Sequence, residues 1–201
     1  MIFIISGPSG CGKSTLVQFA LAEIPDLEFS VSHTTRAQRD TEEEGKDYYY
    51  ISSTEFEAMI AEERLAEWAL VHGNYYVTSK KELEKKGTNK DLILDIDVQG
   101  ADQLRKKVKK GVYIFVLPPS YAELRKRLEK RGQDSQESIR GRLETAKKEI
   151  RSYVHFDYII VNRQLDEAVR DLLAILRSSK CSLAKQQKLI IPILQSFAGT
   201  E

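Results

Sequence analysis

A glycine-rich segment near the N-terminus has the residue types and the spacing of a phosphate-binding loop. Residues 7–14 read GPSGCGKS, which fits the pattern G-x-x-x-x-G-K-[ST] at every fixed position. Such a loop wraps a phosphate with backbone N–H groups, and the helix that follows adds the positive end of its dipole. We expect Lys13 to reach the β- and γ-phosphates and Ser14 to ligate Mg²⁺. The motif predicts a nucleoside triphosphate and phosphoryl chemistry, and it leaves the acceptor open.

Two acids, Asp95 and Asp97, follow an apolar run. Acids at the carboxyl end of a strand in an α/β sheet face the crevice where ligands bind. Asp95 is therefore a candidate to hold Mg²⁺ through water. One of the two acids can instead cap the next helix.

Two arginines four residues apart, Arg127 and Arg131, fall on one face of an expected helix. Arg142 lies beyond a joint of residues 131–135, which read RGQDS. A mobile element with such arginines is typical of kinases that close over small substrates to exclude water. The alternative for the first two arginines is pairing within the helix with acids such as Glu123.

Elements that position these residues alternate along the chain. Continuous apolar runs predict buried strands at 2–5, 92–96, 112–117 and 158–161. Helical patterns lie between them at 14–24, 54–65, 136–151 and 165–177, with a further helix opening at Ser120. Thr54 and Ser120 each begin the pattern of a capping box. This order predicts an α/β fold: a three-layer sandwich of the phosphate-loop type with a parallel core sheet.

The polar stretch 30–50 is too long for an ordinary loop, so an inserted lobe is expected there. The predicted division is a core of residues 1–31, 89–125 and 152–180, a lobe of 32–88, a helical lid of 126–151 and a tail of 181–201. The tail is weakly patterned and contains Pro192, and we expect it to pack on the core or on a neighbour.

Composition excludes several classes of protein. The 201 residues are 41% hydrophobic and 30% charged, as in ordinary globular domains. Lys plus Arg is 31 and Asp plus Glu is 30, so no global basic field for nucleic acid exists. Two cysteines make no disulfide framework, and the first residues lack the pattern of a signal peptide or a membrane span. A cytoplasmic location, no membrane or nucleic-acid partner and a possible homo-oligomer are the expectations.

Other phosphate-loop classes fit less well. A GTPase needs an N-K-x-D element after a strand, whereas residues 89–91 read NKD and precede one. A motor-type ATPase is usually larger. A small-molecule kinase remains.

The sequence resembles the guanylate kinases in their soluble bacterial form. The resemblance runs from residue 1 to about 177 and is carried by SGPSGCGKSTL, FSVSHTTRAQR, GKDYYYI, EWALVHGNYY, LILDIDVQGA, VLPPSYAELRKRLEKRGQDS and DYIIVN. It implies transfer of the γ-phosphoryl group of ATP to GMP, and to dGMP as well, with Mg²⁺, giving ADP and GDP. The lobe would bind GMP.

On the acceptor side, the resemblance assigns the phosphate of GMP to Arg36, Arg39, Tyr48 and Tyr76. Guanidinium forks match phosphate geometry, and tyrosine hydroxyls donate hydrogen bonds without adding charge.

The resemblance assigns the guanine base to Glu67, with Ser32 and Thr78 at its other edge and Asp97 on the same side. A carboxylate accepts from both N1–H and the 2-amino group of guanine. Adenine has an acceptor at N1 and would leave that carboxylate unpaired.

On the donor side, the resemblance implies ATP contacts along the loop and beside the adenine, at Gly7, Pro8, Ser9, Gly10, Cys11, Gly12, Lys13, Ser14, Thr15 and Asn162. The implied catalytic cations are Lys13, Arg36, Arg127, Arg131 and Arg142. The lid arginines would neutralise the transferring phosphoryl group.

Two features leave alternatives open. Val77 stands where the family usually has glycine, which puts a close backbone approach to GMP in doubt. A non-catalytic interaction module of similar fold, or a kinase of another phosphorylated acceptor, would also resemble this family. The intact phosphate loop argues against the module, and Ser32, Glu67 and Thr78 argue for guanine.

Overall fold

The computed structural model describes residues 1–84, 90–130 and 135–198. Its central sheet has five strands in the order β2-β7-β1-β8-β9, and every neighbouring pair is parallel. The strands are β1 (Ile2–Ser6), β2 (Leu27–Phe29), β7 (Asp91–Asp95), β8 (Val112–Leu117) and β9 (Tyr158–Val161). The four strands expected from apolar runs are confirmed, and the short β2 is added at one edge.

Helices cover both faces of this sheet, as a parallel sheet with unbroken apolar strands requires. One core cluster joins Phe3, Ile5 and Ile114 to α1 (Lys13–Glu23) and α7 (Leu165–Lys180). The other joins Ile4 and Leu94 to α4 (Val98–Lys107) on the opposite face. These are the three layers that the sequence predicts.

A second sheet of four strands follows in the order β4-β3-β6-β5, where β3 and β4 are parallel and the other pairs antiparallel. Its strands are β3 (Ser32–Thr34), β4 (Tyr48–Tyr50), β5 (Leu65–Val71) and β6 (Asn74–Ser79), accompanied by α2 (Ser53–Ala61) and α3 (Lys80–Glu84). The ring of Phe56 on α2 stacks on Tyr75 with centroids 3.9 Å apart. This sheet lies within the lobe expected at 32–88; the boundaries of the lobe remain a prediction.

The helix expected at 54–65 needs two corrections. Its N-cap is Ser52, whose side chain accepts from the backbone N–H of Glu55, and not Thr54. The helix ends at Ala61, and Leu65 already begins β5. A cap two residues earlier satisfies the first free N–H groups, and the β-forming run from Leu65 then pairs with β6.

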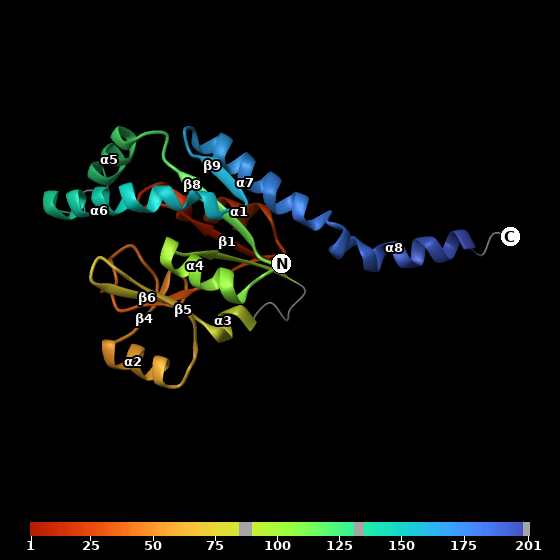
Figure 1. Cartoon of the computed structure of the whole chain (residues 1–201), viewed down its shortest axis with the longest axis horizontal. Coiled ribbons are helices and arrows are strands. Elements are labelled where there is room, and N and C mark those ends of the chain that lie inside the picture. Colours follow the sequence, from red (N-terminus) through yellow and green to blue (C-terminus); the bar gives the residue numbers. More distant parts are fainter. Residues whose placement is uncertain (85–89, 131–134, 199–201) are drawn as a thin grey trace.

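The span 126–151, expected to be a lid, takes in the second half of α5 (Tyr121–Lys130) and all of α6 (Gln136–Glu149), and it ends within the 3₁₀ helix η2 (Ile150–His155). The two helices share a small core of Leu124, Leu128, Ile139 and Leu143. The Ser120 cap is confirmed by its bond from the N–H of Glu123. Of the joint expected at 131–135, residues 131–134 lie outside the described residues, and Ser135 is the N-cap of α6. This helix pair and the four-stranded sheet project from the same end of the core (Figure 1).

The segment after α7 differs from the expected tail on the core. Residues Leu183–Ala198 form α8, a helix that contains Pro192 and extends away from the body of the molecule (Figure 1). Among the described residues, no helix is both long and apolar enough to cross a membrane.

Candidate active site

A cleft of about 750 Å³ lies between the phosphate loop, the four-stranded sheet and α6. The structure thus brings together residues from five separate parts of the sequence. The predicted site residues that line it are Gly7, Ser9, Gly10, Gly12, Lys13, Ser14, Thr15, Ser32, Arg36, Arg39, Tyr48, Glu67, Tyr76, Asp95, Asp97 and Arg142.

The loop from β1 to α1 has a positive φ at Gly7, Gly10 and Gly12, a backbone conformation that favours glycine. Gly7 has a φ of 142°, and a Cβ there would lie 2.2 Å from the carbonyl oxygen of Val116. Gly12 has a φ of 102°, and its Cβ would lie 2.4 Å from Nδ2 of Asn162. These close approaches fix the loop against β8 and against the residue that follows β9.

Lys13 folds back over the loop. Its Nζ donates to the carbonyl oxygens of Gly7, at 2.7 Å, and of Pro8, at 3.3 Å. Burial lowers the pKa of Lys13, but the neighbouring Cys11 and the acids Asp95 and Glu149 outweigh this effect and the net shift is upward. The side chain is therefore a charged ammonium at the point where phosphates would enter the loop.

Ser14 and Asp95 form a hydroxyl–carboxylate pair at the edge of the sheet. Ser14 Oγ donates to Oδ2 of Asp95 at 3.0 Å, which joins the start of α1 to the end of β7. Mg²⁺ prefers oxygen ligands and keeps several waters, so it needs few protein groups. The chemistry of this pair fits such an ion.

An arginine and tyrosine cluster occupies the lobe side of the cleft. The guanidinium of Arg36 donates from Nε to the Tyr76 hydroxyl at 3.2 Å, from NH1 to the carbonyl oxygen of Ala37 at 2.7 Å, and from NH2 to both carboxylate oxygens of Glu42, at 2.8 and 3.0 Å. Arg39 lies 3.7 Å from the same carboxylate. Tyr48 places its ring 5.4 Å from the Arg36 guanidinium.

Glu42 is a residue that the sequence prediction did not name. Besides Arg36, it accepts from the hydroxyl of Tyr50 at 2.7 Å and from the backbone N–H of Arg39 at 3.0 Å. Burial alone would raise the pKa of Glu42, but these bonds outweigh it and the net shift is downward. Its ionised carboxylate holds the two arginines in place. The sequence offered one signal, an acid three residues after Arg39.

Glu67 is a buried carboxyl group, 3% exposed, on β5. Its Oε1 accepts from the hydroxyl of Thr78 at 2.5 Å across the β5–β6 pair. Burial raises the pKa of Glu67 to about 7. A Cβ on Gly100 would lie 2.3 Å from its Oε2, so the start of α4 must pass the carboxyl without a side chain. Ser32, 6% exposed, lines the same cleft.

Asp97 has a clear structural role. It is the N-cap of α4 and accepts from the backbone N–H groups of Gly100, at 2.9 Å, and Gln99, at 3.3 Å. Burial raises the pKa of Asp97 more than these bonds lower it. Of the two acids after β7, this one caps the helix, and it also lines the cleft.

The lid residues reach the phosphate loop by different routes. Arg142 NH1 donates to Oγ of Ser9 at 3.1 Å. Arg127 donates to the carbonyls of Cys11, at 3.4 Å, and Asn162, at 2.9 Å, and it also pairs with Glu123 at 2.9 Å. The pairing within α5 that the sequence left open is therefore present together with the contacts to the loop.

Two further residues named in the sequence analysis, Asn162 and Val77, have described contacts. Asn162 is buried and donates to the carbonyl of Cys11 at 2.8 Å, so it braces the loop. Val77 packs with Phe56 and Met59 on the α2 side of its sheet. Arg131 lies outside the described residues.

Glu149, the last residue of α6, is a second acid that the sequence prediction missed. It lines the cleft, and burial raises its pKa against the opposing effect of Lys13. Tertiary packing places Glu149 at the cleft. The sequence prediction missed it because nothing in the local pattern sets it apart from the other charged residues of that helix.

Comparison with known proteins gives one consistent result. The family model "Guanylate kinase" matches residues 1–179. A guanylate kinase of Geobacter metallireducens is 50% identical over 182 residues, covering 90% of each chain. One of Geobacter sulfurreducens is 48% identical over 186 residues, covering 92% of each. The crystal structure of guanylate kinase from Anaplasma phagocytophilum is 34% identical, with a TM-score of 0.75 over 92% of this chain and 88% of the other.

Proposed function

The chain belongs to the guanylate kinase family, and on that premise we propose that it transfers the γ-phosphoryl group of ATP to GMP, giving ADP and GDP. The observation that carries the proposal is one cleft lined both by the phosphate loop and by Glu67, whose buried carboxyl accepts from Thr78. The deoxy nucleotide dGMP is included as an acceptor, since none of the residues named for the base or the phosphate depends on the 2′-hydroxyl.

The acceptor lies on the four-stranded sheet. Arg36 and Arg39 receive its phosphate, with Tyr48 and Tyr76 donating hydroxyl bonds. Glu42 supports this arrangement, because it already holds both guanidinium groups at the cleft surface. The phosphate then replaces part of the water around these cations and keeps its own charge neutralised.

The guanine base lies against Glu67, with Ser32 and Thr78 beside it. Ionised Glu67 accepts from N1–H and the 2-amino group, and the Thr78 hydroxyl holds the carboxyl in position. Asp97 lines the same region. An adenine base leaves this buried carboxyl without its two donors, so AMP is rejected.

The donor ATP lies on the phosphate loop. Backbone N–H groups of residues 7–15 surround its phosphates, and Lys13 leaves the carbonyls of Gly7 and Pro8 to bind the β- and γ-phosphates. Asn162 lies beside the adenine. Ser14 and Asp95 would hold Mg²⁺, Asp95 through water, and the ion when bound would supply positive charge to neutralise the phosphates of ATP.

The transfer is an in-line displacement. A phosphate oxygen of GMP attacks the γ-phosphorus while the bond to the bridging oxygen of ADP breaks, and the bonding electrons leave with ADP. Lys13 and Arg36 stabilise this charge from the loop and the lobe, and Arg127, Arg131 and Arg142 do so from the lid. Closure of the lid excludes water, which would otherwise accept the phosphoryl group.

A cytoplasmic enzyme without membrane or nucleic-acid partners completes the proposal. The second candidate, a non-catalytic interaction module, is disfavoured by the intact loop and by Lys13 and Ser14 within it.

A coupled assay of ADP release with ATP and GMP tests the proposal. Lys13→Ala removes one cation aimed at the migrating charge, and this should lower turnover by roughly 100–1000-fold, or ~3–4 kcal/mol. Circular dichroism confirms folding of the variant. A parent chain that turns over no GMP would favour the interaction module, and a variant within threefold of the parent would exclude the role of Lys13.

A further inference from the structure

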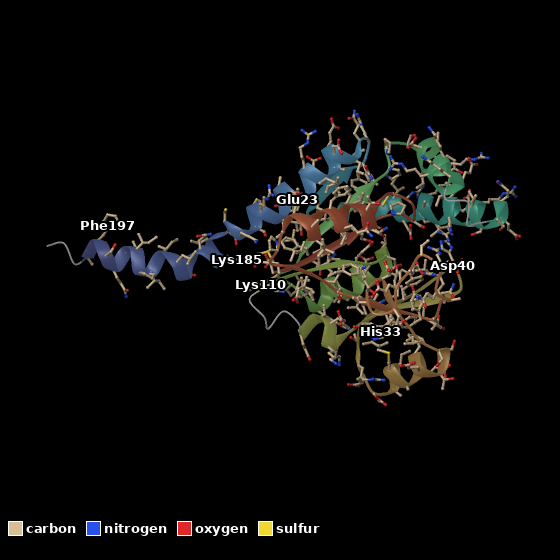
Figure 2. All side chains as sticks on the ribbon, turned by 180° about the vertical axis from the view of Figure 1, so that it is seen from behind. Glu23, His33, Asp40, Lys110, Lys185 and Phe197 are labelled. Atoms are coloured by element: carbon tan, nitrogen blue, oxygen red, sulfur yellow. The ribbon has the colours of Figure 1, made fainter. Side chains whose placement is uncertain are left out.

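The strand that carries Glu67 lies at one edge of its sheet. β5 pairs with β6 on one side, and the order β4-β3-β6-β5 leaves its other side without a strand partner. The helix α4 lies along this sheet in both views (Figure 1 and Figure 2). A helix laid over a sheet edge is one way in which proteins cover the backbone groups that such an edge exposes.

Two side chains of α4 bond to the backbone of β5 on either side of Glu67. Lys107 donates from Nζ to the carbonyl oxygen of Ala66 at 2.6 Å. Gln103 donates from Nε2 to the carbonyl oxygen of Trp68 at 2.6 Å, and its Oε1 accepts from the N–H of the same residue at 3.3 Å. The residues directly before and after Glu67 are therefore both held by one helix.

The spacing of these bonds agrees with the geometry of the two elements. Gln103 and Lys107 are separated by four positions, which is about 6 Å along a helix. The two carbonyl groups that they hold are separated by two positions, which is roughly 6.6 Å along a strand. Gln99 continues the pattern with a longer bond of 3.4 Å to the carbonyl oxygen of Leu70. The bonds therefore define one register between helix and strand.

The strand is irregular at the point where Lys107 holds it. The pairing of β5 with β6 shifts between Leu65 and Glu67, so Ala66 is the extra residue of a bulge. A bulge leaves its extra residue out of the ladder and re-aims the side chain beside it. Here the methyl group of Ala66 joins the core cluster that includes α4, and Glu67 lines the cleft. The bond from Lys107 satisfies the carbonyl of the residue that the ladder omits.

The carboxyl group of Glu67 has little room to move. Its Oε1 accepts from Thr78 at 2.5 Å, and a Cβ on Gly100 would lie 2.3 Å from its Oε2. Gly100 and Gln103 are three residues apart and share one face of α4. The same face thus borders the carboxyl group and holds the backbone on both sides of it, so a shift of the strand along the helix would displace the carboxyl group.

We propose that Gln103 and Lys107 are positioning residues that set the place of the Glu67 carboxylate against the guanine base. The inference rests on the proposed function, in which Glu67 reads guanine. Neither residue is among the described residues that line the cleft, so both act through Glu67 and not on the substrate. A carboxylate selects a base only where it meets that base's donors, so its displacement should weaken both the binding of GMP and the rejection of AMP.

The first test is steady-state kinetics of Gln103→Met and Lys107→Met, which remove the polar bonds and keep an unbranched side chain. A misplacement of ~1 Å can cost up to ~100-fold, so we expect each variant to raise KM for GMP by about 10-fold. The preference for GMP over AMP in kcat/KM should fall by a similar factor, whereas KM for ATP should change by less than about twofold. Lys106→Met is the matched control, because it makes the same change at an exposed neighbour on α4, and it should match the wild type.

The second test separates positioning from stability. Isothermal titration calorimetry measures Kd for GMP without turnover, and this Kd should rise together with KM in both variants. Trp68 is the one tryptophan of the chain, so its emission during urea unfolding reports the stability of the protein at the strand concerned. Gln103→Glu keeps the acceptor for the N–H of Trp68 and loses the donor. It should shift Kd in the same direction by less, and it serves if a methionine variant does not fold.

The outcomes distinguish this inference from the proposed function. Folded variants with lower stability but an unchanged Kd for GMP would overturn the inference, since the bonds would then serve the fold alone. An equal rise of KM for ATP and GMP, or an equal effect of Lys106→Met, would overturn it as well. Both results leave the proposed function intact. A wild-type chain that does not phosphorylate GMP would remove the proposed function, and the positioning role with it.

Discussion

Glu67 is a carboxyl group that the fold buries in the absence of any ligand, and the cost of that burial is visible in its pKa of about 7. In the unfolded chain a glutamate titrates near 4.3. The site is therefore built at the expense of stability near neutral pH, because the ionised form that guanine needs is the form that burial disfavours. Such a group is more often found where a ligand supplies the missing partners than in a core.

This cost has a measurable sign. Since the folded pKa lies above the unfolded one, the folded protein binds more protons between the two values, and its stability falls as pH rises from about 4.5 to about 7. Above pH 7 this contribution is constant. Compared with Glu67→Gln, the wild-type protein should lose up to roughly 3 kcal/mol between pH 5 and 8. Urea unfolding of both proteins at the two pH values measures the difference. Parallel pH profiles would show that Glu67 is ionised throughout.

At the scale of single elements, α6 carries one arginine toward the phosphate loop and another toward solvent. Arg142 lies in the cleft and contacts Ser9, whereas Arg140, two residues earlier on the same helix, is exposed. We expect Arg142→Met to lower kcat by about 100-fold or more, with a smaller effect on KM for GMP, because its contact with the transferring group forms on closure.

Arg140→Met is the matched control for that experiment and should retain full activity. Steady-state kinetics with ATP saturating and GMP varied separate kcat from KM. A rise in KM for GMP with no change in kcat would show that Arg142 binds the acceptor GMP and does not act on the transferring group.

The start of α2 gives a prediction about stability. Ser52 accepts from the N–H of Glu55, so Ser52→Ala should cost ~1 kcal/mol of unfolding free energy. Thr54 is exposed within the first turn, and Thr54→Ala should change stability by no more than a few tenths of a kcal/mol. Chemical unfolding of the two variants compares them. A larger loss of stability for Thr54→Ala than for Ser52→Ala would show that Thr54 is the N-cap, as the sequence pattern predicts.

These elements also show how far sequence reasoning reaches. Continuous apolar runs locate β1, β7, β8 and β9 to within a residue, because strands covered on both faces leave an unambiguous pattern. The three-residue strands β2, β3 and β4 leave none, since their register is set by neighbours far away in the sequence. Similarly, Glu149 joins the cleft through tertiary packing, so its local sequence could not single it out, and the one local signal for Glu42 is its spacing of three residues from Arg39.

At the scale of the whole molecule, the cleft is formed by the phosphate loop of the core together with the four-stranded sheet and α6. One cleft is lined by residues of the phosphate loop, by Glu67 from the four-stranded sheet and by Arg142 from α6. The residue types could be predicted from motif and resemblance. The course of α8 could not, because the local pattern with Pro192 gave no reason for a helix directed away from the core.

The central claim is that the cleft selects guanine through Glu67 and phosphorylates GMP. The most direct test is kcat/KM for GMP and AMP, with ATP as donor, in the wild-type chain and in Glu67→Gln. The wild type should prefer GMP by roughly 10⁴-fold or more, since a buried carboxyl rejects a base that cannot pair with it. In Glu67→Gln one acceptor oxygen becomes a donor amide, so GMP activity should fall and the GMP-to-AMP ratio should drop sharply. An unchanged ratio in a folded variant, or a wild-type chain that accepts AMP as well as GMP, would contradict the account.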